Sequence, residues 1–234
     1  MIGMSAIRGR MRRRILLTYR VDPEVARAII PTPFRPQLVD GSAVAGICMI
    51  ALTDLRPGCV RPRIGISTEN TAHRFAVEWD EGASPRTGVY VTERHTSGLV
   101  PVLGGGRFFP GMQRRARFDV EESDSRFRVR MRASDASVSA DVEVSERWDS
   151  TLFPTIEDAS AFYRNGAIGW SPRRGGGAEG LELTSSRWAV RAATVNDVTS
   201  SFFDGLPAGA ATLDSALVMH DIPVLWRRPE TPRP

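Results

Sequence analysis

Apolar and polar residues alternate along most of the chain, and this alternation predicts a protein built mainly of β-strands. In the segment 74–79 every second residue is a large apolar one, which is the pattern of a strand with one buried face. The same period of two recurs at 126–132 and at 137–144, separated by a four-residue turn at 133–136. We therefore expect these last two segments to form a pair of adjacent antiparallel strands.

The turn lengths also predict which charged residues face each other across this part of the sheet. A turn at 133–136 sets Arg128 opposite Asp141 and Arg126 opposite Glu143. A similar turn at 122–125 sets Asp119 opposite Arg128. Because opposite charges that face each other stabilise adjacent strands, these arginines are expected to form a solvated sheet face and not a binding site.

Few helices are expected between the strands. One helix is predicted over 23–30, because Asp22 is a good N-cap and a proline follows it. A second, over 155–165, begins with Thr155 in a capping box and ends at Gly166. No linker or internal repeat is visible, so we expect residues 1–234 to form a single domain. Further strands are predicted at 12–20, 42–52, 181–195, 211–219 and 222–227.

The segment 88–119 is the first candidate for a functional site. It begins as a strand, continues with Glu93, Arg94 and His95, passes through a Gly-rich turn and becomes a strand again near Gln113. Titratable groups at the end of a strand, followed by a loop, are a common arrangement in binding and catalytic sites. The alternative is a solvated strand end followed by a surface loop.

The composition excludes one class of reaction and argues against one class of partner. All 31 basic residues are arginines, so the sequence contains no lysine and no side chain that could form a Schiff base with a carbonyl substrate. The net charge is +4, but the arginines alternate with acids along most of the chain. The one basic cluster, at 8–14, is short, so we expect no nucleic-acid partner.

The sequence predicts a cytoplasmic protein without a metal or cofactor. No segment approaches the roughly 18 apolar residues that span a bilayer, and arginines interrupt the N-terminal segment where a signal peptide would be apolar. Cys48 and Cys59 form neither a CxxC motif nor a disulfide framework. His73 and His95 lie near carboxylates, but their spacing matches no known zinc motif, and no nucleotide-binding loop is present.

Several segments carry a resemblance to a known family. They are LLTYRVDPEVARAIIPTPFRPQLVDG, STENTAHRFAVEWD, GVYV, GGRFFPG and LDSALVMHDIP. With these segments the chain is similar to the DUF2071 (YqjF-like) family of the acetoacetate decarboxylase-like superfamily, and the likeness covers nearly all of it. This resemblance implies a mainly β (α+β) fold, an antiparallel cone-shaped β-barrel with a few short helices that encloses a small-molecule pocket.

The resemblance also implies which pocket residues of the decarboxylases have counterparts here. Arg12 falls where those enzymes have an arginine on the first strand, and Glu69 falls on the second of their two glutamates. The first glutamate would fall in 42–52, which contains no acid, and the Schiff-base lysine would fall in 92–101, where there is no lysine. The family therefore implies the scaffold and the pocket without the decarboxylation.

Our preferred hypothesis is a small-molecule-binding protein whose ligand is a small organic acid or a similar metabolite. The pocket would be lined by Glu69, Glu93 and His95. The ligand-binding residues would be Arg12, His73, Arg94, Arg107 and Gln113.

Two alternatives and one open point accompany this hypothesis. The chain could be a lyase, hydratase or isomerase that uses Glu69 or Glu93 as the base and His95 as the acid. It could also be a basic module that binds nucleic acid through the cluster at 8–14. No membrane partner is expected, and a homo-oligomer is an open alternative because the decarboxylases form oligomers.

Overall fold

The protein is mainly β, as the alternation predicts. The structure is a computed structural model that describes residues 6–58, 65–82, 84–98, 111–173 and 175–229. Its helices are α1 (Pro23–Ile29), α3 (Ile156–Asn165) and α4 (Ser201–Asp204). Its strands are β1 (Ile7–Val21), β2 (Arg35–Pro36), β3 (Leu38–Val39), β4 (Ser42–Pro57), β5 (Ile66–Glu81), β6 (Ser84–Thr96), β7 (Gln113–Arg115), β8 (Arg117–Glu122), β9 (Arg126–Arg132), β10 (Ser137–Val144), β11 (Ile168–Pro172), β12 (Ala178–Thr184), β13 (Arg191–Ser200) and β14 (Ala211–Arg227).

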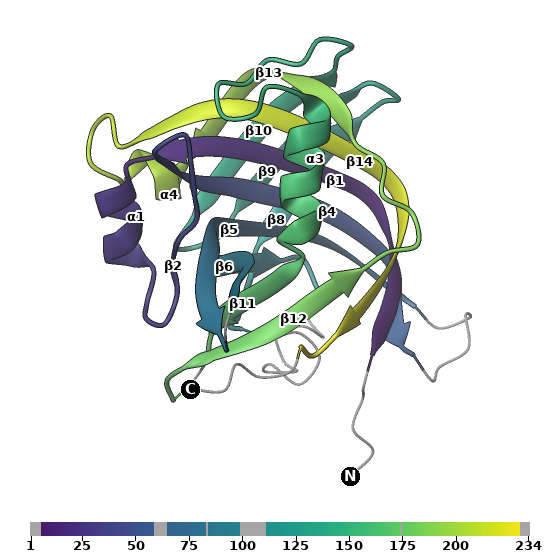
Figure 1. Ribbon diagram of the computed structural model, residues 1–234. Helices are drawn as coiled ribbons and strands as arrows, with labels where there is room; N and C mark the ends of the chain where they lie inside the picture. The colour runs from purple at the N-terminus through teal and green to yellow at the C-terminus, as the bar shows by residue number, and fades with distance from the viewer. Residues whose placement is uncertain (1–5, 59–64, 83, 99–110, 174, 230–234) are drawn as a thin grey trace.

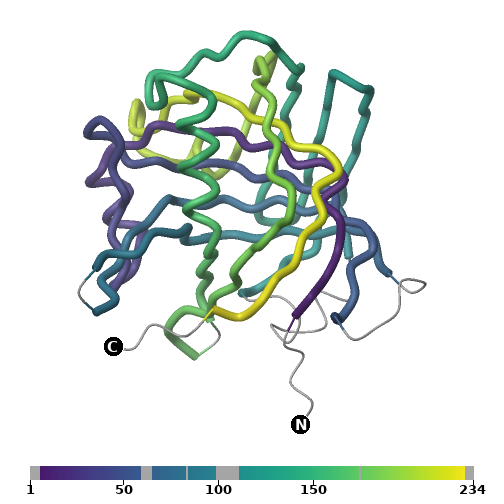
Figure 2. Tube along the Cα trace, turned by 45° about the vertical axis from the view of Figure 1, so that its right-hand side comes forward, coloured from purple at the N-terminus to yellow at the C-terminus, as the bar shows by residue number. Residues whose placement is uncertain are grey.

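Seven of these strands close into a ring. Strand β1 pairs with β4 along one edge and with β14 along the other, and the long strands run side by side in Figures 1 and 2. From β4 the order continues through β5, β6, β11 and β12, and β12 pairs with β14. The contact between β6 and β11 is parallel, whereas the other pairings in the ring are antiparallel.

The outer side of the ring packs against a second group of strands. Strand β14 also pairs with β13, and from there the sheet continues through β10 and β9 to β8. Leu17, Ile47 and Phe75 point to this side, where they form one core with Phe127 and Val138 of the second group. Because successive side chains of a strand point in opposite directions, the residues between them point into the ring.

The inner side of the ring is partly filled by α3, which crosses it in Figure 1. Leu16, Cys48 and Leu217 from the strands form a separate core with Ala159 and Tyr163 of the helix. The Tyr163 hydroxyl lies 2.5 Å from the hydroxyl of a threonine on β1. The helix therefore fills one end of the ring, and the site described below lies beyond it.

The predicted helix caps are confirmed. The Asp22 side chain accepts hydrogen bonds from the backbone N–H groups of Glu24 and Val25, at 2.8 and 3.2 Å. The Thr155 hydroxyl accepts from the backbone N–H of Asp158 at 3.1 Å. Each bond satisfies a donor that the first turn of a helix leaves unpaired.

The predicted register of the β9–β10 pair is also confirmed. Arg128 faces Asp141, and the Asp141 carboxylate accepts hydrogen bonds from the guanidinium groups of both Arg126 and Arg128 at 2.8 to 2.9 Å. The neighbouring prediction is wrong by two residues, since Asp119 faces Arg130. The β8–β9 turn has the predicted length but lies one residue further along the chain, between Glu122 and Phe127, and this changes the register by two residues.

Several other boundaries differ from the prediction. The alternation predicted at 74–79 belongs to a longer strand, β5, which also contains the polar run 67–73. The predicted break at His220 and Asp221 is a change of phase within the single strand β14, where Asp221 has a φ of 51°. The predicted strand at 181–195 divides into β12 and β13, and β11 and α4 were not predicted. None of the described helices is long and apolar enough to cross a membrane.

Candidate functional site

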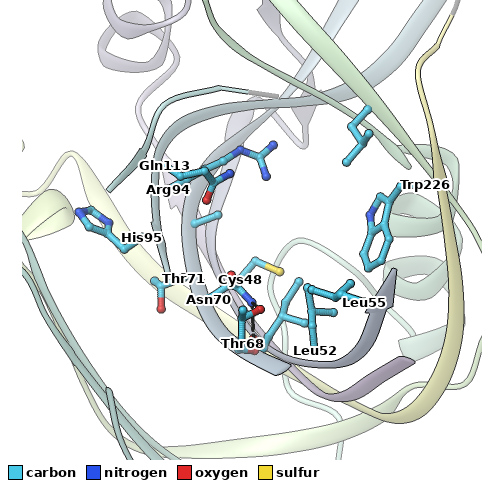
Figure 3. A pocket seen from close by; sticks show the side chains of 13 residues that line it. Cys48, Leu52, Leu55, Thr68, Asn70, Thr71, Arg94, His95, Gln113 and Trp226 are labelled. Carbon is cyan, nitrogen blue, oxygen red and sulfur yellow. Dashed lines mark hydrogen bonds between the residues drawn. The ribbon is translucent and has the colours of Figure 1, made fainter. Parts of the chain in front are cut away.

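A cavity of about 90 Å³ lies inside the ring, next to the part that α3 fills. One wall is apolar and contains Leu52 and Leu55 of β4, Leu181 of β12 and Trp226 of β14. Figure 3 shows the Trp226 indole bounding the side opposite the polar groups. This wall keeps water away from the space and strengthens electrostatic interactions within it.

The polar wall comes from adjacent positions of β4, β5, β6 and β7. Cys48, Asn70, Arg94 and Gln113 line it, and in Figure 3 the Cys48 sulfur and the Arg94 guanidinium both point into the open space. Arg94 and Gln113 are register partners in the parallel β6–β7 pair, which places the guanidinium beside an amide. The Arg94 Nε–H donates to the Ser171 hydroxyl at 3.0 Å, which fixes the direction of the side chain.

Two more arginines point to the inside of the ring. Arg14 and Arg74 are buried, with 6% and 8% of their surfaces exposed. Arg14 lies over the Trp188 ring at 5.9 Å, and Arg74 lies over the Tyr163 ring at 5.2 Å. Within the described part of the chain, neither of these arginines nor Arg94 forms an ion pair with a carboxylate.

These charges make the inside of the ring strongly cationic. Burial lowers the pKa of Arg94 to about 10, which still leaves the guanidinium charged at neutral pH. Burial alone would raise the pKa of the Cys48 thiol, but the charges of Arg14 and Arg74 outweigh burial and hold that pKa below its ordinary value. A buried positive charge is unfavourable unless an anion balances it, so the arrangement favours an anion in the cavity.

Glu69 points to the outer side of the ring, and it does not line the cavity. Its carboxylate accepts a hydrogen bond from Arg13 at 2.5 Å, and Arg13 also donates to Glu122 of β8 at 2.5 Å. Burial raises the pKa of Glu69 and lowers that of Arg13, and each partner's charge opposes the shift of the other. This cluster joins β1 and β5 to the second group of strands.

His73, Glu93 and His95 also direct their side chains to the outer side. The His73 Nε2 lies 2.9 Å from the Ser200 hydroxyl, and its Nδ1 lies 3.5 Å from the Glu93 carboxylate. The His73 contact lowers the pKa of Glu93. The His95 backbone borders the cavity, but its ring points away in Figure 3 and lies 3.3 Å from the Asp135 carboxylate. Burial lowers the pKa of His95.

Of the predicted ligand-binding residues, the structure brings two to the cavity: Arg94 and Gln113. Arg12 lies at the surface, where it pairs with Glu122 and lies 3.7 Å from Glu69. Arg107 lies outside the described residues. The predicted site residues therefore lie on two opposite sides of the ring: Arg94 and Gln113 face the cavity, and the other described ones face outward.

The sequence-based reasoning missed Arg14, Arg74, Cys48 and Asn70. A signal for Arg14 was present, because it occupies a position in phase with Leu16, on an apolar face of a strand. A charged residue in such a position is either unfavourable or functional. The same alternation divides the basic cluster at 8–14 between the surface and the interior, so it does not form one patch.

Several solved structures have a fold similar to that of this chain. Acetoacetate decarboxylase from Legionella pneumophila has a TM-score of 0.61 at 12% identity, covering 95% of this chain and 84% of that one. An acetoacetate decarboxylase-like enzyme from Sphingomonas wittichii RW1 has a TM-score of 0.61 at 12% identity, with coverages of 98% and 94%. The enduracididine biosynthesis enzyme MppR with bound HEPES has a TM-score of 0.56 at 16% identity, with coverages of 96% and 85%.

The same enzyme MppR has also been solved in complex with pyruvate, with a TM-score of 0.51 at 14% identity and coverages of 95% and 89%. At these identities the likeness shows the fold alone, and it confirms the acetoacetate decarboxylase-like architecture. No curated protein matches the chain. The model of the DUF2071 family, described as an uncharacterized conserved protein, matches residues 8–220. The chain, whose ring of strands was first expected from a resemblance, therefore belongs to the DUF2071 family.

Proposed function

We propose that this protein binds a small carboxylate inside the ring of strands. The observation that carries the proposal is the Arg94 guanidinium, which points into the cavity and, among the described residues, forms no ion pair with a carboxylate, although the charge of Glu179 acts on it. Arg14 and Arg74 add two further positive charges behind the same wall. A carboxylate ligand would balance these charges and accept the paired N–H donors of a guanidinium.

The remaining walls indicate the size and shape of the ligand. A single water needs roughly 10–15 Å³ in the same measure, so about 90 Å³ holds on the order of six waters or a molecule of similar size. The Gln113 amide beside Arg94 supplies a further polar contact, and Leu52 and Trp226 accommodate a short hydrocarbon end. The ligand class is therefore a short-chain organic acid.

The relatives support this class of ligand. MppR is solved with pyruvate, and acetoacetate decarboxylases are named for another small oxo acid. Because this sequence has no lysine, the ligand cannot be held as a Schiff base on a lysine side chain. Glu69, Glu93 and His95 point away from the cavity, so the geometry favours ligand binding over the acid–base reaction considered from the sequence.

The test compares anionic ligands with neutral analogues of the same shape. Thermal shift and calorimetry are measured with acetate and pyruvate, and with acetamide as the uncharged analogue. We expect the carboxylates to raise the melting temperature by mass action and the amide to have little effect. Equal binding of acetate and acetamide, or no binding of either acid, would overturn the proposal.

A substitution then tests the role of Arg94. A hydrogen bond to a charged group contributes about 1.5–3 kcal/mol, so Arg94→Met should weaken carboxylate binding by about 10- to 150-fold. Arg27→Met removes the same charge from the exposed side of α1 and serves as the matched control. Unchanged affinity in a folded Arg94→Met protein would contradict the assignment.

A further inference from the structure

Cys48 occupies a position in the cavity that the proposed binding function does not use. It lies on the inner side of β4, and its sulfur points into the open space in Figure 3. Only 4% of its surface is exposed. The thiol is therefore shielded by the protein yet borders the space where a ligand would lie.

The surroundings of the sulfur are those of an anion. The Arg14 Nε–H donates to the Cys48 Sγ at 3.3 Å, and its Nη1 lies 3.9 Å from the Met219 sulfur. A buried guanidinium without a carboxylate partner needs a charged acceptor, and the thiolate is the acceptor that the geometry supplies. Arg74 is buried on the same side and also acts on this sulfur through its charge.

We propose that Cys48 is a nucleophile of the cavity and reacts with small carboxylates that carry an electrophilic carbon. This inference rests on the proposed function, since the arginines that bind the carboxylate would also place that carbon beside the sulfur. The thiolate is the nucleophilic form of cysteine, and cationic neighbours are a general means of stabilising it. The chain would thus offer sulfur chemistry in a pocket where lysine chemistry is ruled out.

The reaction with a carbonyl compound balances without any additional reagent. A sulfur electron pair forms a bond to the carbonyl carbon, and the π electrons of the C=O bond move to the oxygen. The resulting alkoxide takes up, through water, the proton that the thiol released when it became a thiolate, and the product is a hemithioacetal. Nothing is oxidised or reduced, no group leaves, and the addition is reversible.

The test uses two reagents that differ mainly in charge. Iodoacetate is a small carboxylate with an electrophilic carbon, and iodoacetamide is its neutral analogue; in both reactions the C–S bond forms as iodide leaves with the C–I electron pair. The Cys59→Ser variant makes Cys48 the sole thiol of the sequence. Alkylation rates are measured by intact mass and peptide mapping, with glutathione as the free-thiol reference.

We expect the ratio of the iodoacetate rate to the iodoacetamide rate to be at least 10-fold higher for Cys48 than for glutathione. Millimolar acetate should slow the iodoacetate reaction, which tests the site without a further substitution. Arg94→Met should lower the ratio about 10-fold, and the Arg27→Met control should leave it unchanged. Alkylation should also persist at pH 6, where glutathione has become slow.

The outcomes separate the two proposals. If Cys48 is not alkylated, or if its rate ratio equals that of glutathione, while acetate still stabilises the protein, the nucleophile is wrong and the binding function stands. If neither acetate nor pyruvate binds, the proposed function fails and takes this inference with it. Preferential alkylation by iodoacetate together with protection by acetate supports both.

Discussion

Replacing Glu69 by glutamine separates a structural role from a ligand-binding role. The carboxylate joins the buried Arg13, which has 1% of its surface exposed, and the replacement removes one charged acceptor from that guanidinium. A hydrogen bond between charged groups contributes about 1.5–3 kcal/mol. Because Arg13 keeps Glu122 and Glu69 is itself partly exposed, we expect a loss near the lower end, about 1.5–2 kcal/mol.

The measurements are urea unfolding and thermal unfolding, together with carboxylate titration. A chain of this length loses roughly 2–4 °C of melting temperature per kcal/mol, so Glu69→Gln should lower it by about 3–8 °C. Carboxylate affinity should stay within about twofold of the unmodified protein, because the Glu69 side chain points away from the cavity. Glu24→Gln removes the same charge from an exposed ion pair on α1, and it should cost less than about 0.5 kcal/mol.

The reverse pattern would refute this reasoning. If Glu69→Gln had the stability of the unmodified protein and bound carboxylates 10-fold more weakly, the carboxylate would belong to the ligand site. The side of the sheet to which β5 directs its odd-numbered residues would then be misassigned. A loss of both stability and carboxylate affinity would show that the outer and inner sides of the ring are coupled.

Two further predictions concern stability. Hydrogen bonds from Arg126 and Arg128 hold the pKa of Asp141 below its usual range. The contribution of this carboxylate to the stability of the folded state is therefore present above about pH 4 and is lost as the pH falls further. Asp141→Asn should therefore cost about 1 kcal/mol at pH 7, and urea unfolding should show this difference shrinking below pH 4. A pH-independent difference would contradict the linkage. Gly46→Ala would place a Cβ 2.3 Å from the Leu17 carbonyl oxygen, and we expect a loss of about 2–3 kcal/mol or failure to fold. Gly58→Ala, whose nearest contact would be 3.5 Å, is the control, and equal melting temperatures for the two variants would refute the steric argument.

Much of the fold could be predicted from local patterns. Alternation located β9 and β10 and fixed their register, and side-chain capping located α1 and α3, because each signal lies within a few residues of the structure it determines. The longest strand was divided wrongly, because Asp221 reverses the phase of the alternation without ending the strand. A reversal of phase and a turn produce the same local pattern.

The candidate site was harder to predict, because it depends on which side of a strand faces the inside of the ring. Arg94 was identified from its place at the end of a strand and Gln113 from its place where the next strand begins. Glu93 and His95 were included with them, although their side chains point the other way. Arg14 and Cys48 were missed, because their role depends on the closing of the ring between segments far apart in the sequence. The one local sign was the charge of Arg14 on an apolar face of its strand, and the closure itself leaves no local signal.

The ring is joined unevenly around its circumference. Long antiparallel pairings connect β1 with β4 and with β14, whereas β6 and β11 share two register partners and β12 and β14 share three. The β11–β12 hairpin is thus joined to the rest of the ring by the two shortest pairings. Its backbone amides should exchange with solvent faster than those of β1. Separation of this hairpin from its neighbours would open the wall of strands where the fewest backbone hydrogen bonds have to break. We therefore expect a ligand to enter the cavity here.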